Sequence, residues 1–279
     1  MSDKILYVTD LDGTLLHSDE KTSSYANSVI NFLVEKGIYF SYATARSYIT
    51  ASKVTRGLNA QFPVIVYNGA FIIDNKTQKI LQSNFFNCHE IEEIKTIVNS
   101  HHVSPIVYSY INDVEKFSYH ENVVTDGAKK FLYSRKGDIR ERPVDTSSEL
   151  FAGNVFYFTC IDTEKNLGPL HNQLNGKYNC IFHKEMYSGE QWLEILPLKS
   201  TKSNAILQLK SYLKCEKIVS FGDGKNDISM FEISDECYAV ENAVDELRKI
   251  STDIISNNND DGVAKWLDYN VLKSPSILC

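Results

Sequence analysis

The first third of the chain alternates short apolar runs with segments of helical length, and this order constrains the fold more than any other feature. Apolar runs occupy residues 4–9, 38–43 and 63–68, and helical patterns occupy 23–36 and 47–58. The runs are apolar at nearly every position, which is typical of strands buried on both faces of a parallel sheet. The β-α-β-α-β order predicts an α/β fold with a doubly wound, Rossmann-like parallel sheet.

The pattern changes after about residue 84 and returns near residue 192. A hairpin with its turn at 74–77 closes the first part. Aromatic-rich alternating strands and a helix follow, at 89–102, 104–111, 116–120, 154–161 and 178–183, with a polar stretch at 135–149 that we interpret as a solvated loop. Helical patterns at 201–214, 244–250 and 262–268 belong to the resumed α/β part. We therefore predict a core of residues 1–83 and 190–279, split by an inserted α+β cap domain at 84–189.

Composition excludes several classes of protein. The chain of 279 residues carries 29 basic and 36 acidic side chains, a net charge of −7, and has no long basic run, so a nucleic-acid partner is not expected. No segment has the length and apolarity of a membrane span or a signal peptide. The six cysteines form no C-x-x-C pair and are expected to be reduced thiols. We expect a cytoplasmic protein without membrane partners, and its oligomeric state is left open.

The first chemically informative cluster, Asp10-Leu11-Asp12-Gly13-Thr14, directly follows the first apolar run. Strand residues at i and i+2 share a face, so the carboxylates of Asp10 and Asp12 would project into one space. Ligands of open α/β sheets bind beyond the carboxyl ends of the strands. Two such close negative charges need a cation, a shared proton or strong hydrogen bonds. An Asx-turn that only ends the strand is the alternative.

A second cluster, residues 222–227 (GDGKND), follows the apolar run KIVSF. Asp223 and Asp227 lie one helical turn apart and can reach one region. Carboxylates without His or Cys suit Mg²⁺, which keeps waters for a substrate phosphate. A helix cap at Asp227 is the alternative interpretation.

Two weaker signals complete the pattern. Thr44 ends the second apolar run and could offer a hydroxyl to a phosphate. Lys202 begins a helix, where an ammonium and a helix N-terminus would act together on an anion. Each residue alone would be unremarkable, and only their combination with the aspartates is informative.

In this order, DLDGT, the Thr of YATAR, Lys202 and GDGKND resemble the four motifs of the haloacid dehalogenase-like (HAD) phosphatases. The position of the insertion, YNGA at 67–70 and EILP before Lys202 resemble the Cof-type subgroup, which carries a class IIB cap. Sparse similarity continues through AVENA and DDGVAKWL.

The resemblance implies a role for each matched residue. Asp10 would be the nucleophile and a metal ligand, and Asp12 the general acid/base that also binds metal through its backbone carbonyl. Asp223 would complete the metal site and Asp227 would orient it. The groups that would hold the phosphoryl oxygens are the side chains of Thr44, Lys202 and Asn226 and the backbone N–H groups of Leu11 and Ala45. Ala45 and Ser203 stand where glycine is usual in this family.

The expected activity is that of a phosphoric monoester hydrolase, a Mg²⁺-dependent phosphatase acting on a small phosphorylated metabolite, with a sugar phosphate favoured. An aspartyl-phosphate would divide the reaction into two steps. Arg46 and Asn68 are candidate substrate contacts. A phosphomutase or phosphotransferase that uses the same intermediate, and a catalytically silent sugar-phosphate-binding module, are the alternatives.

Overall fold

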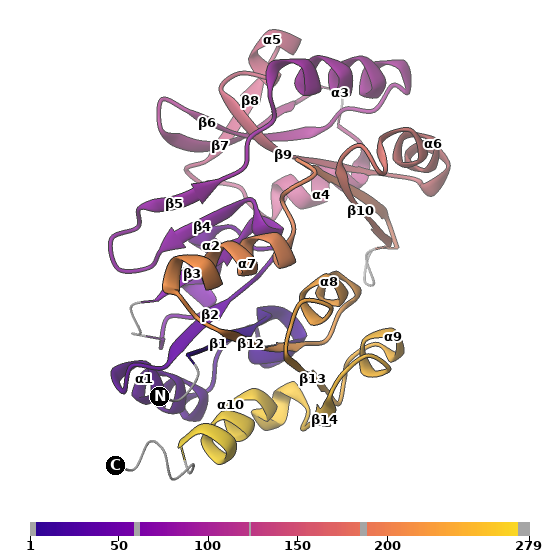
Figure 1. Ribbon diagram of the computed structural model, residues 1–279. Coiled ribbons are helices and arrows are strands. Elements are labelled where there is room, and N and C mark those ends of the chain that lie inside the picture. The colour runs from indigo at the N-terminus through magenta and orange to yellow at the C-terminus, as the bar shows by residue number, and fades with distance from the viewer. Residues whose placement is uncertain (1–3, 59–61, 123, 185–188, 273–279) are drawn as a thin grey trace. The chain divides into compact units, whose positions relative to one another are not determined.

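The computed structural model describes residues 4–58, 62–122, 124–184 and 189–272 (Figure 1). The chain forms two compact units: a core unit of Met1–Ser83 with Ser200–Cys279, and an inserted unit of Asn84–Lys199. This boundary differs from the predicted one for residues 190–199, which the sequence assigns to the core. They lie in the inserted unit because strand β11 (Gln191–Leu196) pairs with β9 (Asn154–Asp162) and β10 (Asn179–Lys184).

The core unit is built on a five-stranded parallel sheet in the order β14-β13-β12-β1-β2. Its strands are β1 (Ile5–Thr9), β2 (Tyr39–Tyr42), β12 (Lys217–Gly222), β13 (Glu236–Val240) and β14 (Asp253–Ile255). The central strand β1 is almost completely buried, as its uninterrupted apolar sequence predicts. The parallel sheet confirms the predicted α/β fold class.

A smaller antiparallel sheet extends the core unit. It contains β3 (Pro63–Val66), β4 (Phe71–Asp74) and β5 (Ile80–Ser83). The predicted turn between the last two strands forms because the Asp74 carboxylate accepts the backbone N–H groups of Lys76 and Thr77, at 2.9 and 2.8 Å. A single parallel bridge between Ala43 and Ile65 joins this sheet to the end of β2.

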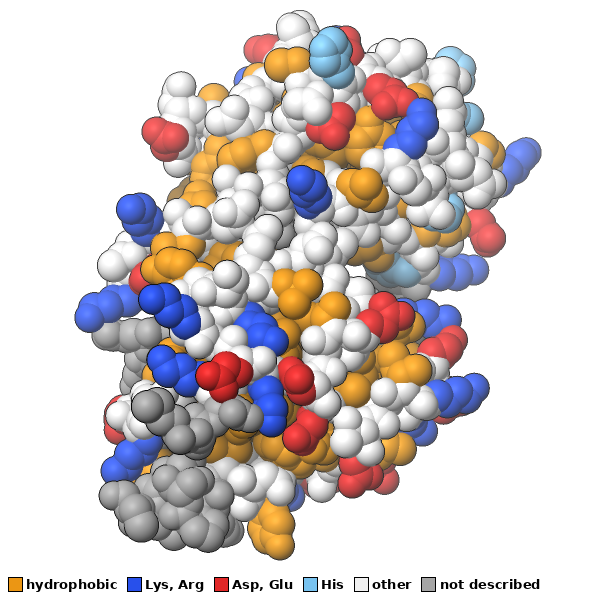
Figure 2. Space-filling view, in the orientation of Figure 1, with side chains coloured by type: hydrophobic (Ala, Val, Ile, Leu, Met, Phe, Trp, Pro, Cys, Tyr) orange, Lys and Arg blue, Asp and Glu red, His pale blue; other side chains and the backbone are white. Residues whose placement is uncertain are grey.

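Helices and short helical turns pack around the parallel sheet. The helices are α1 (Ser24–Glu35), α2 (Tyr48–Val54), α7 (Lys202–Leu213), α8 (Ile228–Phe231), α9 (Asp245–Arg248) and α10 (Gly262–Leu267). The turns are η1 (Leu11–Leu15), η2 (Tyr67–Gly69), η3 (Lys225–Asp227), η4 (Asn258–Asp260) and η5 (Asp268–Leu272). Basic and acidic side chains are interspersed on the face of the core unit drawn in Figure 2. No helix among the described residues is long and apolar enough to cross a membrane.

The buried face of α1 differs from the predicted one. The helical spacing of Tyr25, Val29, Phe32 and Leu33 predicts that they share the buried face, but Tyr25 and Phe32 are 38% and 45% exposed. Ala26 and Ile30 are buried instead, beside Val29 and Leu33. The two exposed rings have local partners, because the Tyr25 hydroxyl donates to Asp268 and the Lys36 ammonium lies over the Phe32 ring.

The inserted unit contains a six-stranded sheet in the order β10-β11-β9-β6-β7-β8. Its remaining strands are β6 (Ile106–Ile111), β7 (Val114–His120) and β8 (Glu141–Val144), and its helices are α3 (Cys88–Ser100), α4 (Asp126–Tyr133), α5 (Ser147–Leu150) and α6 (Glu164–Leu174). An apolar core joins α3 and α6 to one face of the sheet. These helices contribute the buried side chains Ile94, Ile97, Val98, Leu167, Leu170 and Leu174.

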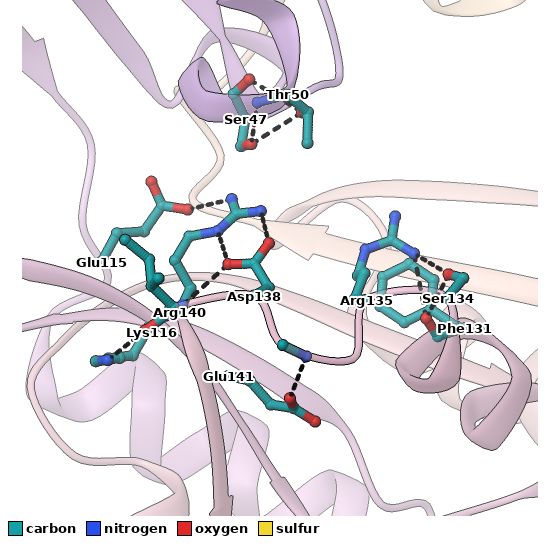
Figure 3. Close-up of polar contacts among 12 residues, drawn as sticks. Ser47, Thr50, Glu115, Lys116, Phe131, Ser134, Arg135, Asp138, Arg140 and Glu141 are labelled. Carbon is teal, nitrogen blue, oxygen red and sulfur yellow. Dashed lines mark hydrogen bonds and ion pairs between the residues drawn. The ribbon is translucent and has the colours of Figure 1, made fainter. Parts of the chain in front are cut away.

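The polar stretch 135–149 is not wholly a loop, because it contains β8, which pairs parallel to β7, and α5. Figure 3 shows the Arg140 guanidinium between two carboxylates, 2.7 Å from Glu115 and 2.6 Å from Asp138. Arg140 is only 4% exposed. Pairing of its charge lets a sequence of strongly polar composition pack as regular structure.

Candidate active site

The site begins where three parallel strands end. The backbone N–H of Asp10 donates to the carbonyl of Phe221 on β12, at 2.9 Å. The N–H of Ala43, after β2, donates to the carbonyl of Thr9, also at 2.9 Å. These bonds hold the carboxyl ends of β2, β1 and β12 side by side, as expected for the ligand-binding edge of such a sheet.

Three aspartates meet at this edge around one lysine. Asp10, Asp223 and Asp227 each present a carboxylate oxygen, and these oxygens lie within 4.8 Å of one another. The Lys202 Nζ, at the start of α7, lies 2.7 Å from Asp10 Oδ1 and 2.7 Å from Asp227 Oδ1. Asp10, Asp227 and Lys202 are all buried. Ionised, three carboxylates and one ammonium leave two negative charges, which suits a divalent cation.

Burial and mutual repulsion dominate the electrostatics of the cluster. Burial raises the pKa of Asp10 well above its usual range, against the opposing effect of the Lys202 ammonium. Burial, reinforced by the charge of Asp227, raises the pKa of Asp223 to about 6. Burial alone would lower the pKa of Lys202, but the Asp10 and Asp227 carboxylates outweigh it and raise that pKa. The donor set, all carboxylate oxygen, fits a hard cation such as Mg²⁺.

The turn after β1 is shaped to approach Asp223. Gly13 has φ +73°, and a Cβ at this position would lie 2.4 Å from Asp223 Oδ2, so a side chain there would be strained and would displace the Asp223 carboxylate. The next residue, Thr14, donates its hydroxyl to Asp223 Oδ1 at 2.8 Å. Thr14 lies inside the DLDGT motif, but no role was predicted for it. The buried side chain of Leu11 anchors the turn.

Asp227 acts on the second acidic loop in two directions. Its Oδ2 accepts the backbone N–H groups of Asp223 and Gly224, both at 3.0 Å, while its Oδ1 accepts from Lys202. It therefore caps the loop, as the simpler interpretation held, and also joins the charged cluster. Asn226 lies exposed on the same loop.

The Asp12 carboxylate bonds to Arg46, whereas Lys202 bonds to Asp10 and Asp227. The Arg46 Nε lies 2.8 Å from Asp12 Oδ2 and its Nη2 lies 2.5 Å from Asp12 Oδ1. A second carboxylate, Glu20, lies 2.9 Å from the same Nη2. Arg46 was predicted as a substrate contact, and here it holds the predicted general acid/base in place.

Thr44 and its neighbours form a loop that packs on the strained turn η2. Thr44 is fully buried and its Oγ1 accepts the N–H of Arg46 at 3.1 Å, whereas Ala45 is exposed. Tyr67 and Asn68 have φ near +50° and donate their N–H groups to the carbonyls of Arg46 and Thr44. Asn68, a predicted substrate contact, is only 3% exposed.

Gly69 completes η2 with φ +96° and touches the start of α7. A Cβ on Gly69 would lie 2.1 Å from the carbonyl oxygen of Thr201. Thr201 is the N-cap of α7 and immediately precedes Lys202. The turn η2 therefore connects the loop of Thr44 to the helix that carries Lys202.

Comparison with known proteins gives this arrangement its family. The model of the haloacid dehalogenase-like hydrolases matches residues 7–267. The chain belongs to this family. The match extends over both parts of the core unit and the inserted unit between them, and confirms the resemblance drawn from the four motifs and the predicted enzyme class.

Curated relatives that align with nearly the whole of this chain are named as phosphatases. Two proteins of Bacillus subtilis, both named 5-amino-6-(5-phospho-D-ribitylamino)uracil phosphatase, are each 26% identical to this chain, and the alignments cover 94% and 93% of it and 96% and 95% of the relatives. A crystal structure from Thermotoga maritima has a TM-score of 0.77 at 25% identity, covering 96% of this chain and 97% of that one. A haloacid dehalogenase-like hydrolase from Bacteroides thetaiotaomicron, 22% identical with a TM-score of 0.78, covers 96% of this chain and 100% of its own, and supports the fold.

The individual roles of the site residues stay predictions. The structure brings Asp10, Asp223, Asp227 and Lys202 together, and places Asp12 on Arg46. Two further residues, Asn242 and Asn258, hold the turn after Asp10 through hydrogen bonds described below. Their segments, AVENA and the residues before DDGVAKWL, lie in or beside stretches that resembled the family, but an amide in a loop carries no periodic pattern that would have singled it out.

Proposed function

We propose that this protein is a Mg²⁺-dependent phosphatase that hydrolyses a small phosphate monoester through a phosphoryl group carried on Asp10. The observation that supports this most is the convergence of Asp10, Asp223 and Asp227 within 4.8 Å, with Lys202 bonded to two of them. These groups come from distant parts of the sequence. Burying three carboxylates close together costs free energy, so a purely structural role would not explain why all four groups are gathered here.

Asp10, Asp223 and Asp227 would hold the cation through carboxylate oxygens. When bound, Mg²⁺ supplies positive charge that draws the phosphate to the site and stabilises the charge of the transferring phosphoryl group. Lys202 lies where it would neutralise a phosphoryl oxygen beside Asp10, and the raised pKa of its ammonium keeps it charged at neutral pH.

In the first step a carboxylate oxygen of Asp10 would attack phosphorus as the bond from phosphorus to the ester oxygen breaks. Asp12, protonated, would give its proton to the departing oxygen, so an alcohol leaves. A general acid contributes about 10²–10⁴-fold to such a step. The contact with Arg46 holds Asp12 at the edge of the site before substrate arrives.

In the second step a water oxygen would attack the phosphorus of the aspartyl-phosphate, and the Asp12 carboxylate would take the proton of that water. The bond between phosphorus and Asp10 breaks, which releases phosphate and restores the free Asp10 carboxylate and the protonated Asp12. Dividing hydrolysis in this way replaces one difficult reaction by two easier ones.

For the substrate we propose a phosphate monoester of a sugar or polyol. Two relatives are named for a phosphorylated ribityl compound. An alkoxide is a poor leaving group, and a site that offers Asp12 as proton donor is suited to it. The alternatives from the sequence, transfer of the phosphoryl group to a second sugar and binding without turnover, are tested by the same experiment.

The test is release of inorganic phosphate from a panel of sugar, polyol and nucleotide monophosphates, with Mg²⁺ and with excess chelator. We expect turnover that requires Mg²⁺ and is abolished by Asp10→Asn. The matched control is Asp253→Asn, which changes an exposed carboxylate at the start of β14 and should leave turnover unchanged.

Three outcomes would contradict the proposal. Undiminished turnover in chelator would exclude the metal, and turnover by Asp10→Asn would exclude the nucleophile. Formation of an isomeric phosphosugar that depends on an added bisphosphate, without phosphate release, would assign the chain to the phosphomutases.

A further inference from the structure

The loop after β13 contributes none of the three clustered aspartates and not Lys202. It nevertheless forms hydrogen bonds with both the turn after Asp10 and the loop of Asp223. Asn242 in the loop after β13 donates Nδ2 to the carbonyl oxygen of Gly13 at 2.7 Å. Two residues later the backbone N–H of Val244 donates to the carbonyl oxygen of Asp223 at 2.9 Å. The same short segment therefore touches the turn after Asp10 and the loop of Asp223.

These two bonds close a ring with one already described. Gly13 is followed by Thr14, whose hydroxyl donates to the Asp223 carboxylate at 2.8 Å. The ring runs from Asn242 through Gly13 and Thr14 to the side chain of Asp223, then from the Asp223 carbonyl through Val244 back to Asn242. This ring of hydrogen bonds therefore holds both the main-chain carbonyl and the side-chain carboxylate of Asp223. Among the described residues, Asn242 has the only side chain that donates a hydrogen bond to the Gly13 carbonyl.

A second asparagine holds Asn242 in this position. The backbone N–H of Asn258, in η4, donates to Asn242 Oδ1 at 3.1 Å, while the Asn258 Nδ2 donates to the carbonyl of Leu16 at 2.8 Å. Asn258 is 6% exposed. Both polar atoms of the Asn242 amide are therefore used, and the carbonyls of Gly13, within the turn η1, and of Leu16, directly after it, are both fixed.

We propose that Asn242 is a positioning residue that sets the affinity of the aspartate cluster for a divalent cation. It does so by holding the Gly13–Thr14 turn against the Asp223 carboxylate. Mg²⁺ requires nearly ideal ligand geometry at short distances, so a site whose turns can drift apart binds it more weakly. The inference rests on the proposed function only in taking this cluster as a cation site.

The test is calorimetric titration of the full chain with Mg²⁺ alone, without substrate. Asn242→Ala should raise the dissociation constant for Mg²⁺ roughly three- to tenfold, the factor expected from the loss of one neutral hydrogen bond. At saturating Mg²⁺ the kcat for phosphate release should stay within about twofold of the unmodified protein, since Asn242 does not touch the reacting atoms.

A matched control separates positioning from general loss of a hydrogen bond. Asn270→Ala removes another exposed amide that donates to a backbone carbonyl, that of Trp266, at 3.0 Å. It should leave the Mg²⁺ affinity unchanged. Asn258→Ala frees the Leu16 carbonyl after the same turn but keeps the backbone N–H that bonds to Asn242. It should weaken Mg²⁺ binding in the same direction, and it serves if Asn242→Ala does not fold.

The outcomes distinguish this inference from the proposed function. Equal Mg²⁺ affinities for the unmodified protein and Asn242→Ala, or equal weakening by Asn270→Ala, would overturn the inference whether or not phosphate is released. Binding of Mg²⁺ that Asn242→Ala weakens, with no hydrolysis of any monoester, would uphold the inference and overturn the proposed function. Absence of Mg²⁺ binding by the unmodified protein would overturn both.

Discussion

The contact between Gly69 and the start of α7 makes a quantitative prediction for Gly69→Ala. Two separate penalties apply to this substitution. An alanine would have to adopt φ +96°, a region that costs an L-residue about 1–2 kcal/mol. Its Cβ would also lie 2.1 Å from the Thr201 carbonyl oxygen and 2.5 Å from the carbonyl carbon, so backbone must move by about an ångström to restore ordinary contact.

The expected loss follows from adding these terms. Overpacking of this kind costs about 1–3 kcal/mol, and the reduced freedom of the unfolded chain returns about 0.4–1 kcal/mol. Gly69→Ala should therefore lower the free energy of unfolding by about 2–4 kcal/mol. The displaced backbone belongs to the N-cap residue that precedes Lys202, and a shift of about 1 Å in a positioning element can reduce turnover on the order of 100-fold.

Gly37→Ala is the matched control. Gly37 ends α1 with φ +84°, and nothing lies within 4 Å of its added Cβ. It therefore suffers the conformational penalty without the clash. Thermal unfolding and phosphate release should show a fall of about 5–15 °C with a large loss of activity for Gly69→Ala, against about 1–4 °C and full activity for Gly37→Ala. Similar behaviour of the two variants would refute the idea that the approach to Thr201 constrains the site.

Two further predictions concern charged groups. Arg46→Ala should lower kcat/KM for an alkyl phosphate about 10- to 100-fold, because it releases Asp12. The loss should be much smaller for an aryl phosphate, whose leaving group needs no proton. An equal loss for both substrates in steady-state kinetics would contradict this role of Arg46. In the inserted unit, burial raises the pKa of Glu194 from 4.5 to about 7. The folded protein therefore binds the Glu194 proton more tightly than the unfolded chain does. The stability that this proton contributes is lost as the pH rises from 4.5 through 7. Glu194→Gln should therefore stabilise the protein by about 1–3 kcal/mol at pH 8 and by almost nothing at pH 4.5, and denaturant unfolding at the two pH values showing the same difference would exclude this cause.

The features of the site that the sequence predicted are those fixed by strand ends. Asp10 and Asp223 each follow an uninterrupted apolar run, and parallel strands in one sheet bring their carboxyl ends to one edge. Lys202 could be placed beside them only through the resemblance to the family, because the strand before its helix, β11, belongs to the antiparallel sheet of the inserted unit. The sequence could not predict that Arg46 would turn to Asp12, since this depends on the direction of a long side chain.

Elsewhere, local pattern failed where packing or pairing overrode it. In α1 the small side chain of Ala26 takes a buried position, and the larger Tyr25 beside it is left exposed with its hydroxyl on Asp268. Strand β8 has a polar sequence that resembles a loop, and the charge of Arg140, just before it, is neutralised by the nearby Asp138 together with Glu115 on the distant strand β7. Both outcomes depend on partners that a window of local sequence does not contain.

The place of β1 in the middle of the parallel sheet has a consequence for biosynthesis. β1 pairs with β2 on one side, but its other neighbour, β12, begins at Lys217. A ribosome adds about 5–20 residues per second, so one edge of β1 waits about 10–40 s for its partner to be translated. During that interval the nascent chain exposes an unpaired apolar strand edge, which is open to mispairing and aggregation. The same delay means that no truncated translation product ending before Asp223 could assemble the acidic cluster.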